Sequence, residues 1–201
     1  MAEENDKGIS RRGFIGLVGK VAALFPVYSV SKTIDSLVGN EAHAQTYEMP
    51  SDNELRQWMT QPVEKTLEET GVIYVDDRNY QTEVFQKNIP KSERQPVMVL
   101  FYSDSIYSRG NAALVKAINQ NFPEIKVGAY RTARGNIVPY DEVQRLKRTY
   151  GLRDTPAIMF YKNDNGDINY LAQFSGGIKT LDFLKNTINR YNNDIPVKFL
   201  K

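Results

Sequence analysis

The stretch Val97-Met-Val-Leu-Phe-Tyr-Ser-Asp-Ser-Ile-Tyr-Ser-Arg-Gly-Asn-Ala-Ala-Leu-Val-Lys-Ala-Ile118 decides the fold of this chain. Its first six residues form an unbroken apolar run, which predicts a central strand buried on both faces. A polar loop over 103–110 is expected next, followed by a helix over 109–121. Loops that lead from a buried parallel strand into a helix hold the ligand sites of many open α/β sheets. The content of this loop therefore bears most directly on function.

The amino-acid composition excludes several kinds of chemistry. The chain has 201 residues, no cysteine and a single histidine, His43. Thiolate catalysis, disulfides and cysteine-bound zinc are therefore excluded. If His43 is removed with a leader segment, histidine catalysis and histidine-bound metals are excluded as well. The net charge of +2 gives no indication of a nucleic-acid partner, and no motif predicts a metal or a cofactor.

The N-terminal segment has the features of an export signal. Arg11 and Arg12 lie in Ser10-Arg-Arg-Gly-Phe-Ile15, which resembles the twin-arginine signal, and a moderately apolar stretch follows over 14–30. Ala42-His-Ala44 fits a small-x-small cleavage site, so we expect cleavage after Ala44 and a periplasmic location. The alternative is an ordinary amphipathic helix with a chance arginine pair. An uncleaved signal would anchor the protein in the membrane.

The rest of the chain alternates helix and strand patterns. Helices are predicted over 53–70 with a break near Gln61, and then over 80–88, 140–150 and 181–191. Strands are predicted over 72–75, 125–130, 157–161 and 168–174, with a hairpin turn at 163–166. The expected organisation is a signal peptide (1–44), a helical extension (45–71), an α/β domain (72–191) and a C-terminal tail (192–201). The tail is expected to be loose, or to add a short strand.

This order of elements resembles the thioredoxin fold over residues 72–191. The stretch Tyr150-Gly-Leu-Arg-Asp-Thr-Pro156 is similar to the family segment in which a helix, a glycine and a proline-led strand precede the hairpin. Phe174-Ser-Gly-Gly177 matches the end of the last strand. The resemblance implies a mixed α/β sheet flanked by helices and a cis peptide bond before Pro156 that faces the active site. The helical extension is then an N-terminal addition.

The chain departs from this family at the residues that carry its chemistry. The family's Cys-x-x-Cys falls on Ser105 to Ser108, or one residue later on Ile106 to Arg109. A serine hydroxyl cannot form a dithiol/disulfide couple. The buried carboxylate that assists proton transfer in thioredoxins falls on Leu100. Thiol–disulfide oxidoreductase activity is therefore not expected, and the chain is predicted to be redox-inactive.

What can survive the loss of the thiols is the peptide groove. In the family, backbone beside the cis proline pairs with an extended peptide, a form of strand addition. The groove residues that the resemblance implies are Ser105, Ile106, Tyr107, Ser108, Arg109, Thr155 and Pro156. The alternative is that these residues only form a helix-entry loop. A serine nucleophile is disfavoured because no base is at hand. Tyr102, Tyr107 and Tyr130 either line the groove or pack at the rim of the core.

Three further groups of mostly charged residues have structural as well as functional interpretations. The Asp76-Asp77 pair is expected to be a helix cap or turn rather than a metal site. Asp164, Asn165 and Asp167 indicate a hairpin turn rather than a calcium loop. A basic group could form a face for an acidic partner, or simply the solvated side of a helix. Its members are Arg131, Arg134, Arg145, Lys147, Arg148 and Arg153.

The leading functional prediction is an exported, redox-inactive thioredoxin-like protein. It would bind a protein or peptide partner as a chaperone, adaptor or assembly factor of the cell envelope. One alternative is a structural subunit of an envelope secretion or conjugation complex. Another is a non-thiol enzyme that uses the 103–110 loop, with Asp104 or a tyrosine as the reacting group. No cofactor, metal or nucleic-acid partner is predicted.

Overall fold

The computed structural model describes residues 47–198 and residue 200. The predicted export signal, with Arg11, Arg12 and the cleavage after Ala44, lies outside the described residues. None of the helices in the described part of the chain is long and apolar enough to cross a lipid bilayer.

A five-stranded mixed sheet with the order β1-β3-β2-β4-β5 forms the centre of the described part of the chain. β2 (Val97–Tyr102) is the middle strand, and all of its residues are buried. It runs parallel to β3 (Lys126–Arg131), which runs parallel to β1 (Ile73–Val75). On its other side β2 is antiparallel to β4 (Ala157–Asp164), which forms a hairpin with β5 (Asp167–Ser175).

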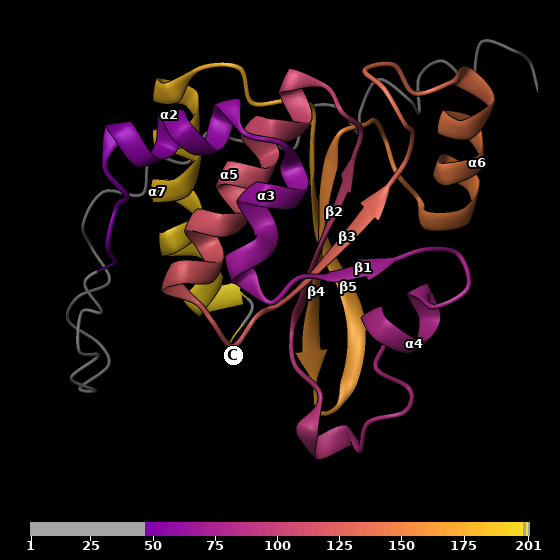
Figure 1. Ribbon diagram of the computed structural model, residues 1–201. Coiled ribbons are helices and arrows are strands. Elements are labelled where there is room, and N and C mark those ends of the chain that lie inside the picture. Colours follow the sequence, from indigo (N-terminus) through magenta and orange to yellow (C-terminus); the bar gives the residue numbers. More distant parts are fainter. Residues whose placement is uncertain (1–46, 199, 201) are drawn as a thin grey trace, which may run out of the picture. The chain divides into compact units, whose positions relative to one another are not determined.

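Helices cover both faces of this sheet (Figure 1). On one face lie α2 (Asp52–Thr60), α3 (Val63–Leu67), α5 (Ile106–Asn121) and α7 (Leu181–Lys198). On the other face lie α4 (Tyr80–Val84) and α6 (Tyr140–Tyr150). Short 3-10 helices follow α3 (Glu68–Thr70) and precede β2 (Lys91–Glu93). The predicted fold class, a mixed α/β sheet flanked by helices, is confirmed.

The central strand divides the interior into two hydrophobic clusters. Met98 and Leu100 pack with the face that carries α2, α3, α5 and α7. Val99 and Phe101 pack with the face that carries α4 and α6. Because successive side chains of a strand point to opposite faces, a six-residue apolar run was needed to fill both clusters.

The predicted N-terminal extension is part of the first cluster. Ser51 and Glu54 form a capping box in which each side chain bonds to the other residue's backbone N–H, and this fixes the start of α2. Leu55 and Trp58 are buried in the same cluster as α5. The predicted break at Gln61 is confirmed, since Gln61 ends α2 in an extended conformation.

The helix after the central strand begins earlier than predicted, at Ile106 rather than at residue 109. Ser105 is its N-cap, and the Ser105 hydroxyl accepts from the backbone N–H of Ser108. A serine in this position satisfies an N–H that has no partner within the helix. The predicted polar loop over 103–110 was therefore too long, and only 103–105 precede the helix.

The prediction of a loose tail or short strand after residue 191 was wrong. The last helix, α7, continues to Lys198 because its final turns still make contacts. Ile195 is buried in the first cluster, and Asn192 accepts a hydrogen bond from Asn121 of α5 at 3.2 Å. The helix before β2 is shorter than predicted, since α4 ends at Val84 and Gln86 takes a positive φ of 51°.

Candidate functional site

Ser105 and Ser108 face each other at the N-terminus of α5. Their hydroxyl oxygens are 3.1 Å apart, and Ser108 Oγ also accepts from the backbone N–H of Ser103 at 3.0 Å. Both side chains are buried. The two hydroxyls therefore satisfy each other and the local backbone. This geometry also identifies Ser105 and Ser108, rather than Ile106 and Arg109, as the pair that occupies the facing positions.

No redox chemistry of the thiol type is available at this pair. The chain contains no cysteine, so a dithiol/disulfide couple cannot form. Leu100, where the resemblance places a proton-relay carboxylate, is fully buried among apolar side chains of the first cluster. The two positions where the resemblance places the redox cysteines therefore carry hydroxyl groups only.

Asp104, next to the serine pair, joins the loops that follow β2 and β3. One carboxylate oxygen accepts from Arg131 at 2.6 Å, and the other accepts from the backbone N–H of Gly135 at 2.6 Å. The Gly135 N–H, assisted by Arg131, holds the pKa of Asp104 below its ordinary value. Arg131 also lies 3.5 Å from Glu64. Arg131 is therefore an ion-pair residue and is not part of a free basic face.

The two residues between the serines point outward. Ile106 is 64% exposed and Tyr107 is 37% exposed. The Tyr107 ring lies over Gly177, where an added Cβ would come within 2.2 Å of the Tyr107 Cβ. Lys179 Nζ lies 4.7 Å from the centroid of the same ring, in cation–π geometry. The predicted groove residues Ile106 and Tyr107 are thus presented to solvent with a cation beside them.

A cleft of about 610 Å³ opens beside Ile106. Arg56 and Met59 of α2 form one wall, and Ile178 and Lys179 of the loop before α7 form the other. The sequence did not predict these wall residues, because they lie about 50 to 75 positions from Ile106. The nearby stretch Phe174-Ser-Gly-Gly177 indicated only the end of the last strand. We call this cleft, with Ile106 and Tyr107, the α5 groove.

Arg109, also predicted for the groove, is a structural link. Its guanidinium donates from Nη1 to the backbone oxygen of Thr60 at 3.1 Å, which ties α5 to the end of α2. This contact helps to hold the α2 wall of the α5 groove in place.

Thr155 and Pro156 lie at the same edge of the sheet as the serine pair. The peptide bond between them is cis. Ala157 pairs with Phe101 at the end of β2, so the two residues before Ala157 lie alongside the segment that leads to Ser105. The Pro156 oxygen accepts from the backbone N–H of Gly176 at 3.1 Å. Pro156 is buried, and the Thr155 N–H donates to its neighbour Asp154 at 2.8 Å.

Two of the three tyrosines considered for the groove do not line it. Tyr102 is buried in the first cluster and donates to Glu64 at 2.9 Å. Tyr130 is buried in the second cluster, on the opposite face of the sheet. Their side chains belong to the core because β2 and β3 are covered on both faces. Of the three, Tyr107 alone belongs to the α5 groove.

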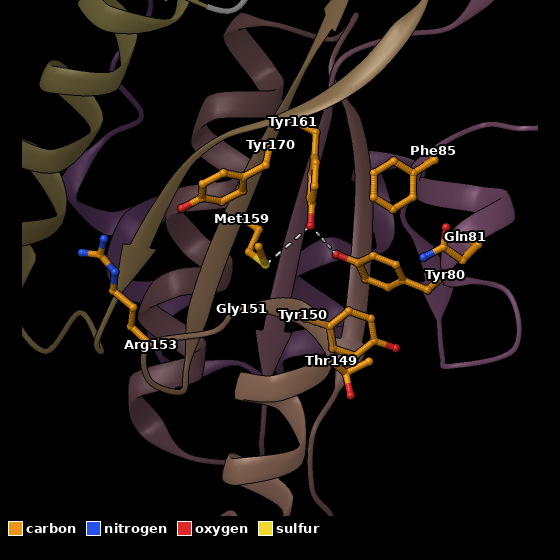
Figure 2. Close-up of a pocket in the computed structure, with 10 residues that line it drawn as sticks. All are labelled: Tyr80, Gln81, Phe85, Thr149, Tyr150, Gly151, Arg153, Met159, Tyr161 and Tyr170. Atoms are coloured by element: carbon orange, nitrogen blue, oxygen red, sulfur yellow. Dashed lines mark hydrogen bonds between the residues drawn. The ribbon is translucent and has the colours of Figure 1, made fainter. Parts of the chain in front are cut away.

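A second cavity, of about 440 Å³, lies on the face of the sheet that carries α4 and α6 (Figure 2). Its walls include Tyr80, Tyr150, Tyr161 and Tyr170. The high tyrosine content, 12 residues, was the available signal in the sequence. Their assembly around one cavity could not be predicted because they come from four separate elements: α4, α6, β4 and β5.

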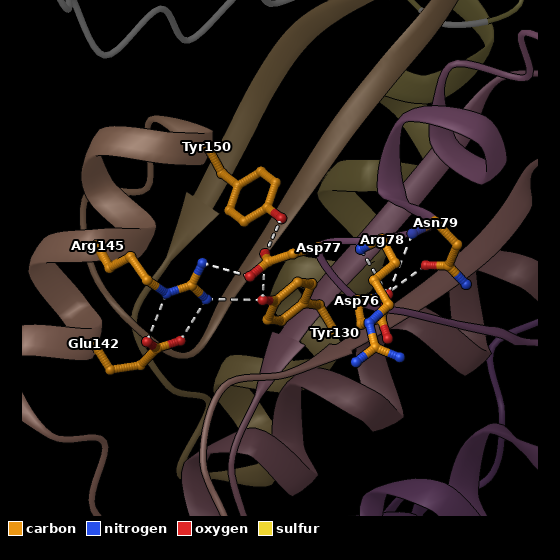
Figure 3. A network of polar contacts seen from close by, with 8 residues as sticks. All are labelled: Asp76, Asp77, Arg78, Asn79, Tyr130, Glu142, Arg145 and Tyr150. Atoms are coloured by element: carbon orange, nitrogen blue, oxygen red, sulfur yellow. Dashed lines mark hydrogen bonds and ion pairs between the residues drawn. The ribbon is translucent and has the colours of Figure 1, made fainter.

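Asp77 is the centre of a polar network beside this cavity (Figure 3). Its Oδ1 accepts from Tyr130 at 2.7 Å and from Tyr150, and its Oδ2 accepts from Arg145 at 2.7 Å. Arg145 also makes two hydrogen bonds of 2.7 Å to Glu142. The predicted turn is present: residues 77–79 form a turn, and Asp76 accepts from two of its backbone N–H groups. The network around the Asp77 carboxylate was not predicted. Arg145, like Arg131, is an ion-pair residue.

Replacing Asp77 with asparagine is expected to lower stability at neutral pH by about 1–2 kcal/mol, because a charged acceptor of several hydrogen bonds is lost from a half-exposed position. Burial raises the pKa of Asp77, but the hydrogen bonds from Tyr150, Tyr130 and Arg145 outweigh it and lower that pKa. The contribution of the Asp77 carboxylate to the free energy of unfolding is therefore complete above the unfolded-state pKa of about 4. It is lost as the pH falls through the folded-state pKa.

Urea unfolding of the wild type and of Asp77→Asn at pH 7 and at stepwise lower pH measures this difference. The difference in the free energy of unfolding between wild type and Asp77→Asn should narrow below about pH 4. The control is Asp141→Asn at an exposed site on α6, which should cost about 0.5 kcal/mol or less. A difference between wild type and Asp77→Asn that stays constant down to pH 2 would contradict the assigned role of the carboxylate.

Comparison with known proteins adds little beyond the fold. No family model matches the chain, and no curated protein matches it. Among solved structures it is similar to a thioredoxin from Trichomonas vaginalis, with 15% sequence identity and a TM-score of 0.40. The match covers 61% of this chain and 98% of that chain. Values this low indicate nothing about activity, and the fold is established by the strand order and helix placement described above.

Proposed function

We propose that this chain is a redox-inactive thioredoxin-like protein that, after export, binds a segment of another protein in the α5 groove. One observation carries this proposal. Ser105 and Ser108 turn their hydroxyls toward each other at 3.1 Å, while Ile106 between them is 64% exposed beside an open cleft. Thiol chemistry is not available at this edge of the sheet, and an apolar contact surface is present there.

The lining of the α5 groove favours a partner segment with apolar and acidic side chains. Ile106, Met59 and Tyr107 offer apolar contacts, and Arg56 and Lys179 add positive charge. Apolar anchors in a cleft supply most of the affinity of such interfaces, and charge complementarity supplies orientation and a faster encounter. Because Asp154 already accepts from the Thr155 N–H, side-chain contacts are expected to matter more than strand addition beside Pro156.

The loop after β3 extends this surface. Ile137 is 83% exposed and Tyr140 is 78% exposed, and Asp104 ties the start of their loop to the segment before α5. Since β2 and β3 are parallel, the loops that follow them lie at one edge of the sheet, at the top of Figure 1. Exposed apolar residues grouped at one edge are typical of a protein interaction site.

Export and an envelope role rest on the sequence. The pair Arg11–Arg12 and the Ala42-His-Ala44 site support export through the twin-arginine route. A chain without cysteine suits an oxidising compartment, where a free thiol risks wrong pairing. An adaptor or assembly factor of the cell envelope fits both the proposed location and the proposed binding surface.

The test is photo-crosslinking in cells from a benzoylphenylalanine placed at position 106. We expect adducts with a small number of specific proteins in the envelope fraction. The matched control places the same residue at position 74, where Tyr74 is also exposed but lies on the edge strand β1. Lys179→Glu should lower the adduct yield about fivefold, because it reverses a charge at the groove.

Two results would refute this proposal. One is the same set of adducts from positions 106 and 74, since that would indicate non-specific contact. The other is catalysed reduction of insulin by the wild-type protein above the rate with dithiothreitol alone. A cytoplasmic location of the adducts would contradict the export part of the proposal while leaving groove binding in place.

A further inference from the structure

We propose that the cavity between α4, α6 and the β4–β5 hairpin binds a small aromatic acid whose ring carries a hydroxyl or N–H donor. This cavity lies on the face of the sheet that carries α4 and α6, whereas the α5 groove is built from α2, α5 and the loop before α7. The inference therefore goes beyond the proposed function and does not depend on it.

The walls of the cavity suit a planar ring. Its volume, about 440 Å³, is in the range of small-molecule sites. The rings of Tyr80 and Tyr150 lie 4.4 Å apart between centroids, and Phe85 packs against Tyr161 edge to face at 5.6 Å. Aromatic walls at tilted and edge-on angles provide the offset and edge contacts that another ring prefers.

The base of the cavity has an acceptor without a donor (Figure 2). The hydroxyls of Tyr80 and Tyr161 are 2.7 Å apart, and Tyr161 Oη lies 3.6 Å from Met159 Sδ. A thioether has no hydrogen to give, so Tyr161 donates to Met159 and must accept from Tyr80. Within the described residues, no group donates to Tyr80 Oη in return. A ligand hydroxyl or N–H that reaches this depth would complete the chain of hydrogen bonds.

A second acceptor lies on the same face of the sheet. Gln173 is the direct cross-strand partner of Met159, and side chains of paired residues project to the same side of a sheet. In the described part of the chain, Gln173 Oε1 is buried without a hydrogen-bond partner. Buried acceptors without partners are rare because each one loses its hydration without compensation. Gln173 lies beside Met159 of the cavity wall but is not itself part of the lining, so the case for a ligand that brings a donor rests on Tyr80 Oη.

The rim of the cavity carries an uncompensated positive charge. Arg153 lines the cavity and is exposed, and among the described residues it has neither an ion pair nor a hydrogen bond. This sets it apart from Arg145, which the nearby carboxylates neutralise. A guanidinium at the mouth of an aromatic pocket is suited to a carboxylate on the ligand. An acceptor at the base and a cation at the rim together define the ligand class.

The experiment is a titration of the full-length protein with 4-hydroxyphenylacetate, followed by ligand-observed NMR and calorimetry. We expect saturable binding of one molecule per chain. Phenylacetate lacks the ring hydroxyl and tyramine lacks the acid, so each should bind about threefold to tenfold more weakly, the effect of one hydrogen bond or one exposed ion pair. Trp58, the chain's single tryptophan, lies in the hydrophobic cluster on the opposite face of the sheet. Its fluorescence therefore reports whether the fold is intact.

Two variants and one control assign the site. Tyr80→Phe removes the acceptor at the base, and Arg153→Glu reverses the charge at the rim; each should weaken binding about fivefold or more. Arg148→Glu, an equal charge change at an exposed site of α6 outside the cavity, should bind like the wild type. If Tyr80→Phe fails to fold, the ligand affinity of Arg153→Glu, a change at an exposed residue, still tests the site.

Three outcomes would overturn the inference. They are no saturable binding by 4-hydroxyphenylacetate, equal binding of all three compounds, and wild-type affinity in Arg153→Glu. Crosslinking from position 106 should be unchanged in Arg153→Glu, so a failure of this site and a failure of the α5 groove are separable.

Discussion

The double variant Ser105→Cys with Ser108→Cys is expected to form an intramolecular disulfide on oxidation, so that its two titratable thiols fall to none. The two hydroxyl oxygens already face each other at 3.1 Å across the first turn of α5. A disulfide requires the two sulfur atoms on these Cβ atoms to come within bonding distance. Small rotations of the two side chains are enough to achieve this. The closed loop is short, so the gain in stability should be at most about 2 kcal/mol.

Because the natural chain has no cysteine, this measurement has no background. Thiol titration and intact mass before and after oxidation give the result directly. The single variants Ser105→Cys and Ser108→Cys are the controls, and each should keep one thiol per monomer or form only dimers. A double variant that also forms only intermolecular dimers would show that the two side chains do not face each other.

Gly110→Ala is expected to destabilise the protein by about 3 kcal/mol or more, a shift in melting temperature of roughly 6–12 °C. A Cβ at residue 110 would lie 2.2 Å from the backbone oxygen of Ile178 and 2.9 Å from its Cβ. Two of the three nearest atoms belong to the backbone of Ile178, so they cannot rotate away from the new Cβ. This backbone is also held in place by Asn111, which donates to the Gly176 oxygen at 3.0 Å and accepts from the Ile178 N–H at 3.1 Å.

The matched control for this substitution is Gly128→Ala in β3. There the new Cβ would meet the nearest atom, a Val99 methyl, at 3.4 Å, so the change should be small. Thermal unfolding followed by circular dichroism measures both variants. Since Ile178 forms a wall of the α5 groove, Gly110→Ala should also reduce crosslinking from position 106. Equal melting temperatures for the two variants would contradict the close packing of α5 against this loop.

Features of the fold that depend only on residues close together in the sequence were predictable. The capping serine at Ser51, the left-handed Gly151 and the turn at Asn165-Gly166 act within a few positions of themselves. The apolar run of β2 needed no knowledge of its partners. Predictions failed where a distant contact decides the outcome, as in the last turns of α7, which persist because Ile195 reaches the core.

The polar network shows why the rest of the candidate sites could not be predicted. Asp77 bonds to Tyr130, which is 53 positions away, and to Tyr150, which is 73 positions away. Nothing in the pattern around Asp77 separates it from a helix cap, because a cap and an ion-pair carboxylate have the same local sequence. The register of β1 against β3, which places Val75 opposite Tyr130, brings these residues together.

By itself, the sequence determined that this protein has no thiol chemistry and that its strands and helices alternate around one buried strand. Composition and short-range periodicity are properties of the chain alone, whatever its tertiary contacts. The tertiary structure decided that Ser105 faces Ser108, that α2 and the loop before α7 wall a groove beside Ile106, and that four tyrosines enclose a second cavity. Those arrangements depend on strand register and helix packing, which bring together residues that are remote along the chain.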